Sequence, residues 1–108
     1  MWNIEYLPEV KRDLKELDGS QIYIVRKAID KVSKNPLPAS EGGYGKPLGN
    51  KNGIQLSGCY KIKIKKEGIR VVYKLVREEE KMRVVIVGAR ADSEVYEEAA
   101  ERIKKNNL

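Results

Sequence analysis

Residues 59–73 read CYKIKIKKEGIRVVY, and their alternation of polar and apolar residues limits the fold more than any other feature of the chain. A period of two is that of a β-strand with one buried face. The apolar face would carry Tyr60, Ile62 and Ile64, and the opposite face Lys61, Lys63 and Lys65. Like charges repel along one strand face. The row of three lysines therefore indicates a face that binds an anion or one that is fully solvated.

The rest of the chain places this strand in an α+β domain. A strand is expected at residues 2–6, a helix from Pro8 to Gly19, and a second helix from an N-cap at Ser20 to Asn35-Pro36. Strands follow at 55–65, 69–77 and 82–88, and a last helix, capped by Asp92 or Ser93, spans 92–105. The order β-α-α-β-β-β-α predicts one domain over residues 1–108. Its sheet should be twisted and mainly antiparallel, with helices packed on one face.

Residues 39–53, ASEGGYGKPLGNKNG, resemble a phosphate-binding loop only superficially. Proline follows Lys46 where a P-loop needs serine or threonine, and no glycine stands five residues before Gly45. A flexible connector is the expected structure.

The positive charge is concentrated in one third of the chain. Residues 59–90 hold ten basic and four acidic side chains, which accounts for the whole net charge of +6. A localised basic surface is the usual footprint of a polyanion binder, and a solvated edge fits the charge equally well. The N-terminus shows no signal peptide, and the longest apolar run, 84–87, is far too short for a membrane helix. A cytoplasmic protein is expected.

The chain has no histidine, which excludes Ser-His-Asp triads, Cys-His dyads and ordinary zinc sites. Cys59 is the only cysteine, so it should be a packed free thiol with no disulfide partner. No metal, cofactor or small-molecule ligand is expected. Any side-chain chemistry must come from lysine, arginine and tyrosine.

These residue types suit RNA cleavage by transphosphorylation. The reaction needs a base for the ribose 2′-OH, cations for the phosphate, and an acid for the departing 5′-oxygen. A crowd of cations lowers the pKa of a lysine, because a like charge disfavours its protonated form. Lys61 and Lys63 would point the same way, about 6.5–7 Å apart. Arg70 would lie on the neighbouring strand, and Arg90 just past the end of another.

The same residues carry a family resemblance. The segments CYKIKIKKEGIRVVYKL and VGARADSEVYEEAAERI resemble the RelE toxins of type II toxin–antitoxin systems, and the opening WNIEYLPEVKRDLKEL fits the RelE/ParE superfamily. The resemblance implies a RelE-like microbial RNase architecture. It also implies a ribosome-dependent, metal-independent endoribonuclease that cuts mRNA in the A site of the 70S ribosome, contacts rRNA through its basic face, and is neutralised by a RelB-like antitoxin.

The resemblance also assigns roles. Lys63 matches the candidate general base and Lys61 a phosphate ligand. Arg70 matches the arginine that stabilises the transition state, and Arg90 the one that assists the leaving oxygen. Tyr96 matches the tyrosine that stacks on a base, an interaction worth about 1–3 kcal/mol. An antitoxin would cover or displace the last helix, which should dock near Lys61 and Arg90.

Two positions depart from the family pattern. Leu48-Gly49-Asn50 stands where the prototype has an arginine, with Lys46 or Lys51 as possible substitutes, and Ala89 stands where it has a lysine. Both changes predict weaker activity or an altered codon preference.

Other interpretations stay open. Tyr96 could be a core residue and Arg70 the partner of a glutamate. The protein could be a ParE-like gyrase inhibitor, although such chains generally lack the Lys-x-Lys pair followed by SEVY, or a non-catalytic nucleic-acid-binding module.

Overall fold

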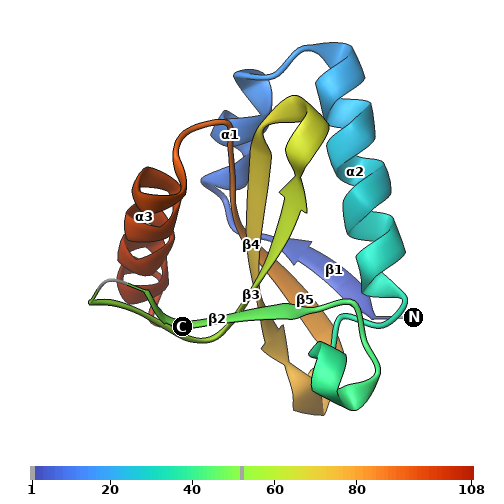
Figure 1. Ribbon diagram of the computed structural model, residues 1–108, viewed down its shortest axis with the longest axis vertical. Helices are drawn as coiled ribbons and strands as arrows, with labels where there is room; N and C mark the ends of the chain where they lie inside the picture. Colours follow the sequence, from blue (N-terminus) through green and yellow to red (C-terminus); the bar gives the residue numbers. More distant parts are fainter. Residues whose placement is uncertain (1, 52) are drawn as a thin grey trace.

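The computed structural model describes residues 2–51 and 53–108, without the side chains of Asn50 and Lys51. The suggestion that Lys51 replaces a missing charge therefore lies outside the described residues. The strands are β1 (Asn3–Tyr6), β2 (Lys46–Lys51), β3 (Ile54–Ile64), β4 (Ile69–Val76) and β5 (Lys81–Gly88). The α-helices are α1 (Val10–Lys15), α2 (Gly19–Ser33) and α3 (Asp92–Lys105) (Figure 1). None of the described helices is both long and apolar enough to cross a membrane.

In the described residues the strands form one mixed sheet in the order β1-β5-β4-β3-β2. β1 runs parallel to β5, and the other neighbours are antiparallel. The predicted α+β class and mainly antiparallel sheet are thus confirmed.

The expected connector at 39–53 was wrong in part, because β2 lies within it and pairs with β3 at the sheet edge. The sequence of β2, KPLGNK, does not alternate, and its register shifts between Pro47 and Gly49. An edge strand tolerates proline because one side needs no ladder hydrogen bond. Leu48, only 4% exposed, anchors the strand in the core.

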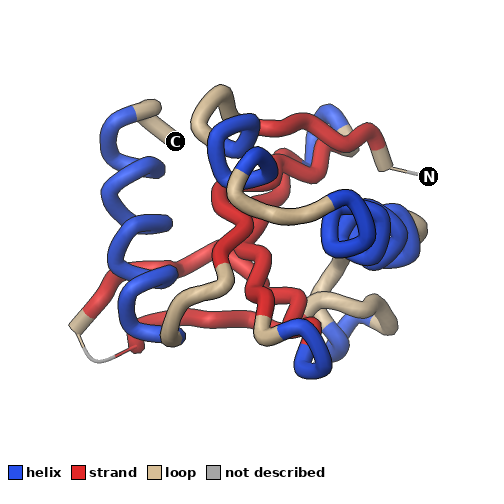
Figure 2. Tube along the Cα trace, turned by 90° about the horizontal axis from the view of Figure 1, so that it is seen from above, coloured by secondary structure: helices blue, strands red, loops and turns tan. Residues whose placement is uncertain are grey.

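The helices cover both faces of the sheet, which corrects the expectation of one covered face. Adjacent strand residues point to opposite faces, and Tyr73 and Lys74 of β4 show where each helix lies. The Tyr73 hydroxyl donates to the Pro36 carbonyl, just beyond α2, at 2.9 Å. The Lys74 ammonium donates to the Leu108 carbonyl, just beyond α3, at 3.0 Å. Figure 2 shows the sheet between these two helices.

The core fills both interfaces of the sheet. Val25 and Ile29 of α2 are fully buried on one side, and Val95 and Ala99 of α3 on the other. Cys59 is a buried free cysteine, as predicted, and burial raises the pKa of its thiol to about 11.

Two predicted helix caps were wrong. Asp18, not Ser20, caps α2: its carboxylate accepts from the Gln21 amide at 2.8 Å, and the Gln21 side chain accepts from the Asp18 amide at 3.0 Å. Ala91 occupies the N-cap position of α3 without a side-chain hydrogen bond. The Asp92 carboxylate is bound to the sheet instead.

Candidate active site

The register of the central strands places the predicted cations on one face of the sheet. Lys63 of β3 pairs with Arg70 of β4, so both side chains lie on the same face. Lys61 lies two residues earlier on that face, and Lys46 is its partner on β2. Lys46, one of the two lysines that could substitute for the missing arginine, thus joins this basic face.

Lys63 and Arg70 converge on the carboxylate of Asp92 in the first turn of α3. The Lys63 ammonium lies 3.3 Å from Oδ2, and the Arg70 Nε donates to Oδ1. Arg70 Nη1 also donates to the carbonyls of Gly68 at 3.0 Å and Arg90 at 2.8 Å. Burial alone would raise the pKa of Asp92, but the hydrogen bonds from Arg70 and Lys63 outweigh it and hold that pKa below its usual value. The carboxylate partner of Arg70 is therefore an aspartate and not a glutamate.

Tyr96 packs one turn after Asp92, and only 5% of it is exposed. Its hydroxyl is buried and has no hydrogen-bond partner among the described residues. Burial, with the charge of Asp92, raises the pKa of this phenol, and the charge of Arg70 opposes the shift. Tyr96 therefore lies on the site's side of the sheet, but in this arrangement it is a core residue and presents no open ring.

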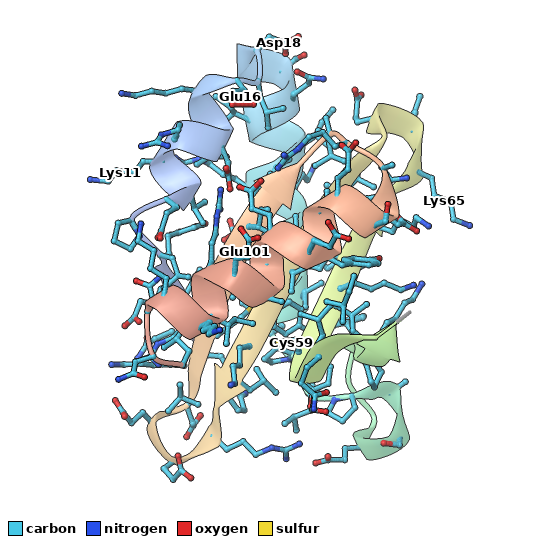
Figure 3. The ribbon with its side chains drawn as sticks, turned by 90° about the vertical axis from the view of Figure 1, so that its left-hand side faces the viewer. Lys11, Glu16, Asp18, Cys59, Lys65 and Glu101 are labelled. Atoms are coloured by element: carbon cyan, nitrogen blue, oxygen red, sulfur yellow. The ribbon has the colours of Figure 1, made fainter. Side chains whose placement is uncertain are left out.

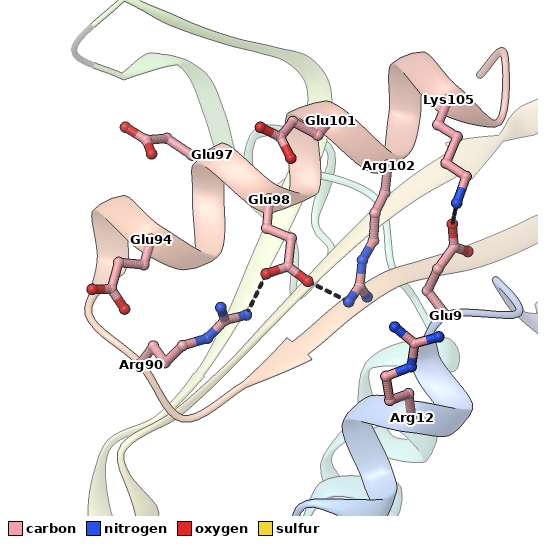
Figure 4. A pocket seen from close by; sticks show the side chains of 9 residues that line it. All are labelled: Glu9, Arg12, Arg90, Glu94, Glu97, Glu98, Glu101, Arg102 and Lys105. Carbon is pink, nitrogen blue, oxygen red and sulfur yellow. Dashed lines mark hydrogen bonds and ion pairs between the residues drawn. The ribbon is translucent and has the colours of Figure 1, made fainter.

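The Arg90 side chain is paired with an acid of α3. Its backbone carbonyl contacts Arg70, yet its Nη2 lies 2.7 Å from the Glu98 carboxylate (Figure 4). Glu98 also accepts from Arg102, so it bridges two guanidinium groups. The structure thus brings Lys61, Lys63, Arg70 and Tyr96 to one region, and it pairs the guanidinium of Arg90 with Glu98.

Two features fix α3 on the sheet. A Cβ built on Gly88 would lie 3.0 Å from Val95 Cγ2, so glycine allows the helix its close approach. The buried Arg102 guanidinium binds both oxygens of the buried Asp13 of α1, at 2.6 and 2.8 Å. Figure 3 shows α3 lying across the sheet, with Glu101 on its outer side and Lys65 just beyond the end of β3.

Sequence reasoning missed the acids of this site. Asp92 resembled a helix cap and Glu98 a solvated helix acid, and no local signal separates either residue from those ordinary uses.

Comparisons with known proteins bear on the sequence and the fold of the chain. No family model matches the chain. A putative RelE-like toxin protein of Escherichia coli is 29% identical over 103 residues, covering 95% of this chain and 98% of that protein. The mRNA interferase toxin RelE of E. coli K12 is 49% identical over 45 residues, which span 42% of this chain and 47% of that toxin.

Solved structures also cover most of the chain. A mutant of E. coli toxin RelE in the free state superimposes with a TM-score of 0.73 at 26% identity, over 94% of this chain and 97% of that one. The chain is RelE-like in sequence and in fold. A RelE mutant in complex with a peptide of the antitoxin RelB superimposes with a TM-score of 0.66 at 25% identity, over 91% and 93% of the two chains. The RelE architecture expected from the sequence is confirmed.

Proposed function

We propose that this RelE-like protein is a toxin that cuts mRNA in the ribosomal A site, inhibits translation, and is neutralised by a cognate RelB-like antitoxin. The protein would act in the cytoplasm, where translating ribosomes are found. The relative of 49% identity carries the name mRNA interferase, and the antitoxin assignment follows from the RelE structure solved with an antitoxin peptide.

One observation carries the enzymatic part of this proposal. Lys63 and Arg70, from neighbouring strands, approach the two oxygens of one carboxylate. Two cations that converge on one small anion form a suitable receptor for a phosphodiester, because its two non-bridging oxygens accept hydrogen bonds in the same way.

The site residues have distinct roles in the proposed reaction. Lys63 takes the proton of the ribose 2′-OH, and that oxygen attacks the adjacent phosphorus. Lys61 and Arg70 hold the non-bridging oxygens while negative charge builds on them. Arg90 assists the departing 5′-oxygen after leaving Glu98, and Tyr96 stacks on a base of the message.

The proposed reaction depends on the ribosome to rearrange two of the site residues. The roles of Arg90 and Tyr96 both require a change from the present arrangement, since one is paired with Glu98 and the other is buried. Binding in the A site would bend the message so that the 2′-OH lies in line with the phosphorus. It would also favour an arrangement in which Arg90 is released from Glu98 and Tyr96 is exposed. Free RNA should therefore be a poor substrate.

The test uses purified translating ribosomes with a defined message, followed by primer extension. Wild-type protein should cut in the A site, and Lys63→Ala should cut about 100-fold more slowly, the usual scale for loss of a general base. Lys66→Ala is the matched control. It removes the same charge from an exposed hairpin turn and should stay within about threefold of wild type.

The alternatives predict other results. A ParE-like protein would leave the message intact and inhibit DNA gyrase in a supercoiling assay. A non-catalytic module would do neither. Absence of A-site cleavage by the wild-type protein would therefore reject the proposed function.

A further inference from the structure

Asp92 has an unusual position for a first-turn acid. An aspartate at a helix start normally serves its own helix, by capping it or by favouring the positive end of the dipole. Among the described residues the carboxylate of Asp92 makes no cap bond, and it reaches back to two strands, 29 residues away at Lys63 and 22 at Arg70.

The Asp92 carboxylate makes the contacts that an ester phosphate would make at this place. Each of its two oxygens is bound by a different cation, Oδ2 by the Lys63 ammonium and Oδ1 by the Arg70 guanidinium. Phosphodiester oxygens in the same place would need the same two donors. A substrate phosphate at this place would therefore compete with the carboxylate for these cations.

The ion pairs are accessible to a competitor. The Asp92 side chain is 43% exposed, and those of Lys63 and Arg70 are 32% and 22% exposed. Exposed ion pairs are weak, typically below about 1 kcal/mol, so a polyanion with several contacts can replace them. Replacement requires rotation of one short side chain or a small shift of the first turn of α3.

We propose that Asp92 is a positioning residue that occupies the phosphate site between Lys63 and Arg70, and that RNA must displace it to bind. This inference rests on the proposed function, since it assumes that a phosphate of RNA binds there. In the resting protein Asp92 keeps the two cations aligned and lowers the affinity for RNA. Release of Asp92 also removes the contacts that hold the first turn of α3, which leads to Tyr96, against the sheet.

Binding of an uncleavable RNA tests this inference without any catalytic step. A short, fluorescently labelled 2′-O-methyl RNA lacks the attacking hydroxyl, and its affinity can be measured by anisotropy. Asp92→Asn keeps the shape of the side chain and removes its charge. It should bind about three- to tenfold more tightly than the wild type, as expected for the loss of two partly exposed ion pairs. Asp92→Ala should show the same gain.

A matched control separates the site from net charge. Glu97→Gln removes one negative charge from an exposed position on the same helix, with no ion pair in the described structure, and should change the affinity less than twofold. Asp92→Asn in a Lys63→Ala, Arg70→Ala background should give no more gain than this control, because the cations that Asp92 occupies are absent. A purely structural role for Asp92 would not produce that dependence.

Two results would overturn the inference: an affinity of Asp92→Asn and Asp92→Ala equal to or weaker than that of Glu97→Gln, or a gain that persists without Lys63 and Arg70. Thermal unfolding of each variant shows that it is folded. A wild-type protein that never cuts on ribosomes, while Asp92→Asn still gains affinity through Lys63 and Arg70, would reject the proposed function and support the role of Asp92.

Discussion

Packing buries Tyr96 in the structure, whereas the proposed function requires its ring to reach the RNA. Its ring fills the interface between α3 and the sheet, but its buried hydroxyl has no partner among the described residues. Burial of an unpaired hydroxyl costs stability. A core residue selected for stability alone would be phenylalanine, so the hydroxyl suggests a use in another arrangement of the helix.

Tyr96→Phe should therefore separate stability from activity. We expect its free energy of unfolding to be unchanged or to rise by about 1 kcal/mol, because an unpaired buried group is removed. A-site cleavage should fall about tenfold, since the hydroxyl could no longer orient the nucleotide. Urea denaturation and the ribosome assay give the two measurements. A loss of stability without a loss of cleavage would assign the hydroxyl a structural partner and no role in the reaction.

The basic residues of the site could be predicted from the sequence, but its acids could not. Alternation along one strand is a local pattern, and it was enough to put Lys61 and Lys63 on one face. The contact of Asp92 with Lys63 depends on strand register and on where α3 begins, across 29 residues. A local capping rule therefore assigned Asp92 to its own helix, and Glu98 had no signal beyond its place on a helix.

At the scale of elements, the central strands and the last helix were predicted well, the helix expected from Pro8 to Gly19 was too long because α1 spans Val10–Lys15, and the irregular β2 was missed. The helix expected at 92–105 has the same bounds in the structure, and β3, β4 and β5 differ from prediction by one residue at some ends. β2 has no periodicity and is held by pairing with β3 and by the burial of Leu48, which are tertiary effects. The faces on which the helices pack were also unpredictable, because an amphipathic pattern does not say which side of a sheet it will meet.

The close packing of α3 on the sheet depends on a glycine, and this gives a second prediction. Gly88→Ala would place a methyl group 3.0 Å from Val95 Cγ2, so the helix must shift or distort. We expect a loss of about 1–3 kcal/mol in the free energy of unfolding, the usual cost of overpacking. The measurement is the urea midpoint followed by circular dichroism.

Gly19→Ala is the matched control for that substitution. Gly19 begins α2, and a Cβ there meets nothing within 4 Å. This change should be neutral or should stabilise the protein by up to about 1 kcal/mol, since alanine restricts the unfolded chain. If the two alanine variants are equally stable, the contact between Gly88 and Val95 does not control how closely α3 packs on the sheet.

At the scale of the whole molecule, the charges form a network that joins the helices to the sheet. Arg102 connects α3 to Asp13 of α1, which also accepts from the Val87 amide of β5 at 3.0 Å. Glu98 adds Arg90 to this network, and a second group of ion pairs, around Asp92, joins α3 to the basic face. An anion that releases Asp92 would leave the buried Asp13–Arg102 pair in place, so only the first turns of α3 need to move.

The pH dependence of stability should reflect this distribution of charge. The chain has no histidine, the side chain whose ordinary pKa lies closest to neutral pH, and burial raises the pKa of the Cys59 thiol to about 11. The hydrogen bond from Arg83 lowers the pKa of Glu5. For Glu98, burial would raise the pKa, but Arg90 and Arg102 outweigh it and lower it. Because these carboxyls have lower pKa values in the folded state, the unfolded chain binds more protons in acid.

The stability that they contribute is complete above the unfolded pKa of about 4.3 and is lost as the pH falls through the lower folded values. We therefore expect a flat free energy of unfolding from about pH 6 to 8, and a decline below about pH 4.5, measured by urea denaturation at each pH. Glu98→Gln should make the acid decline shallower, because one linked carboxyl is gone. A step in stability between pH 6 and 7 would contradict this account, since the chain has no histidine.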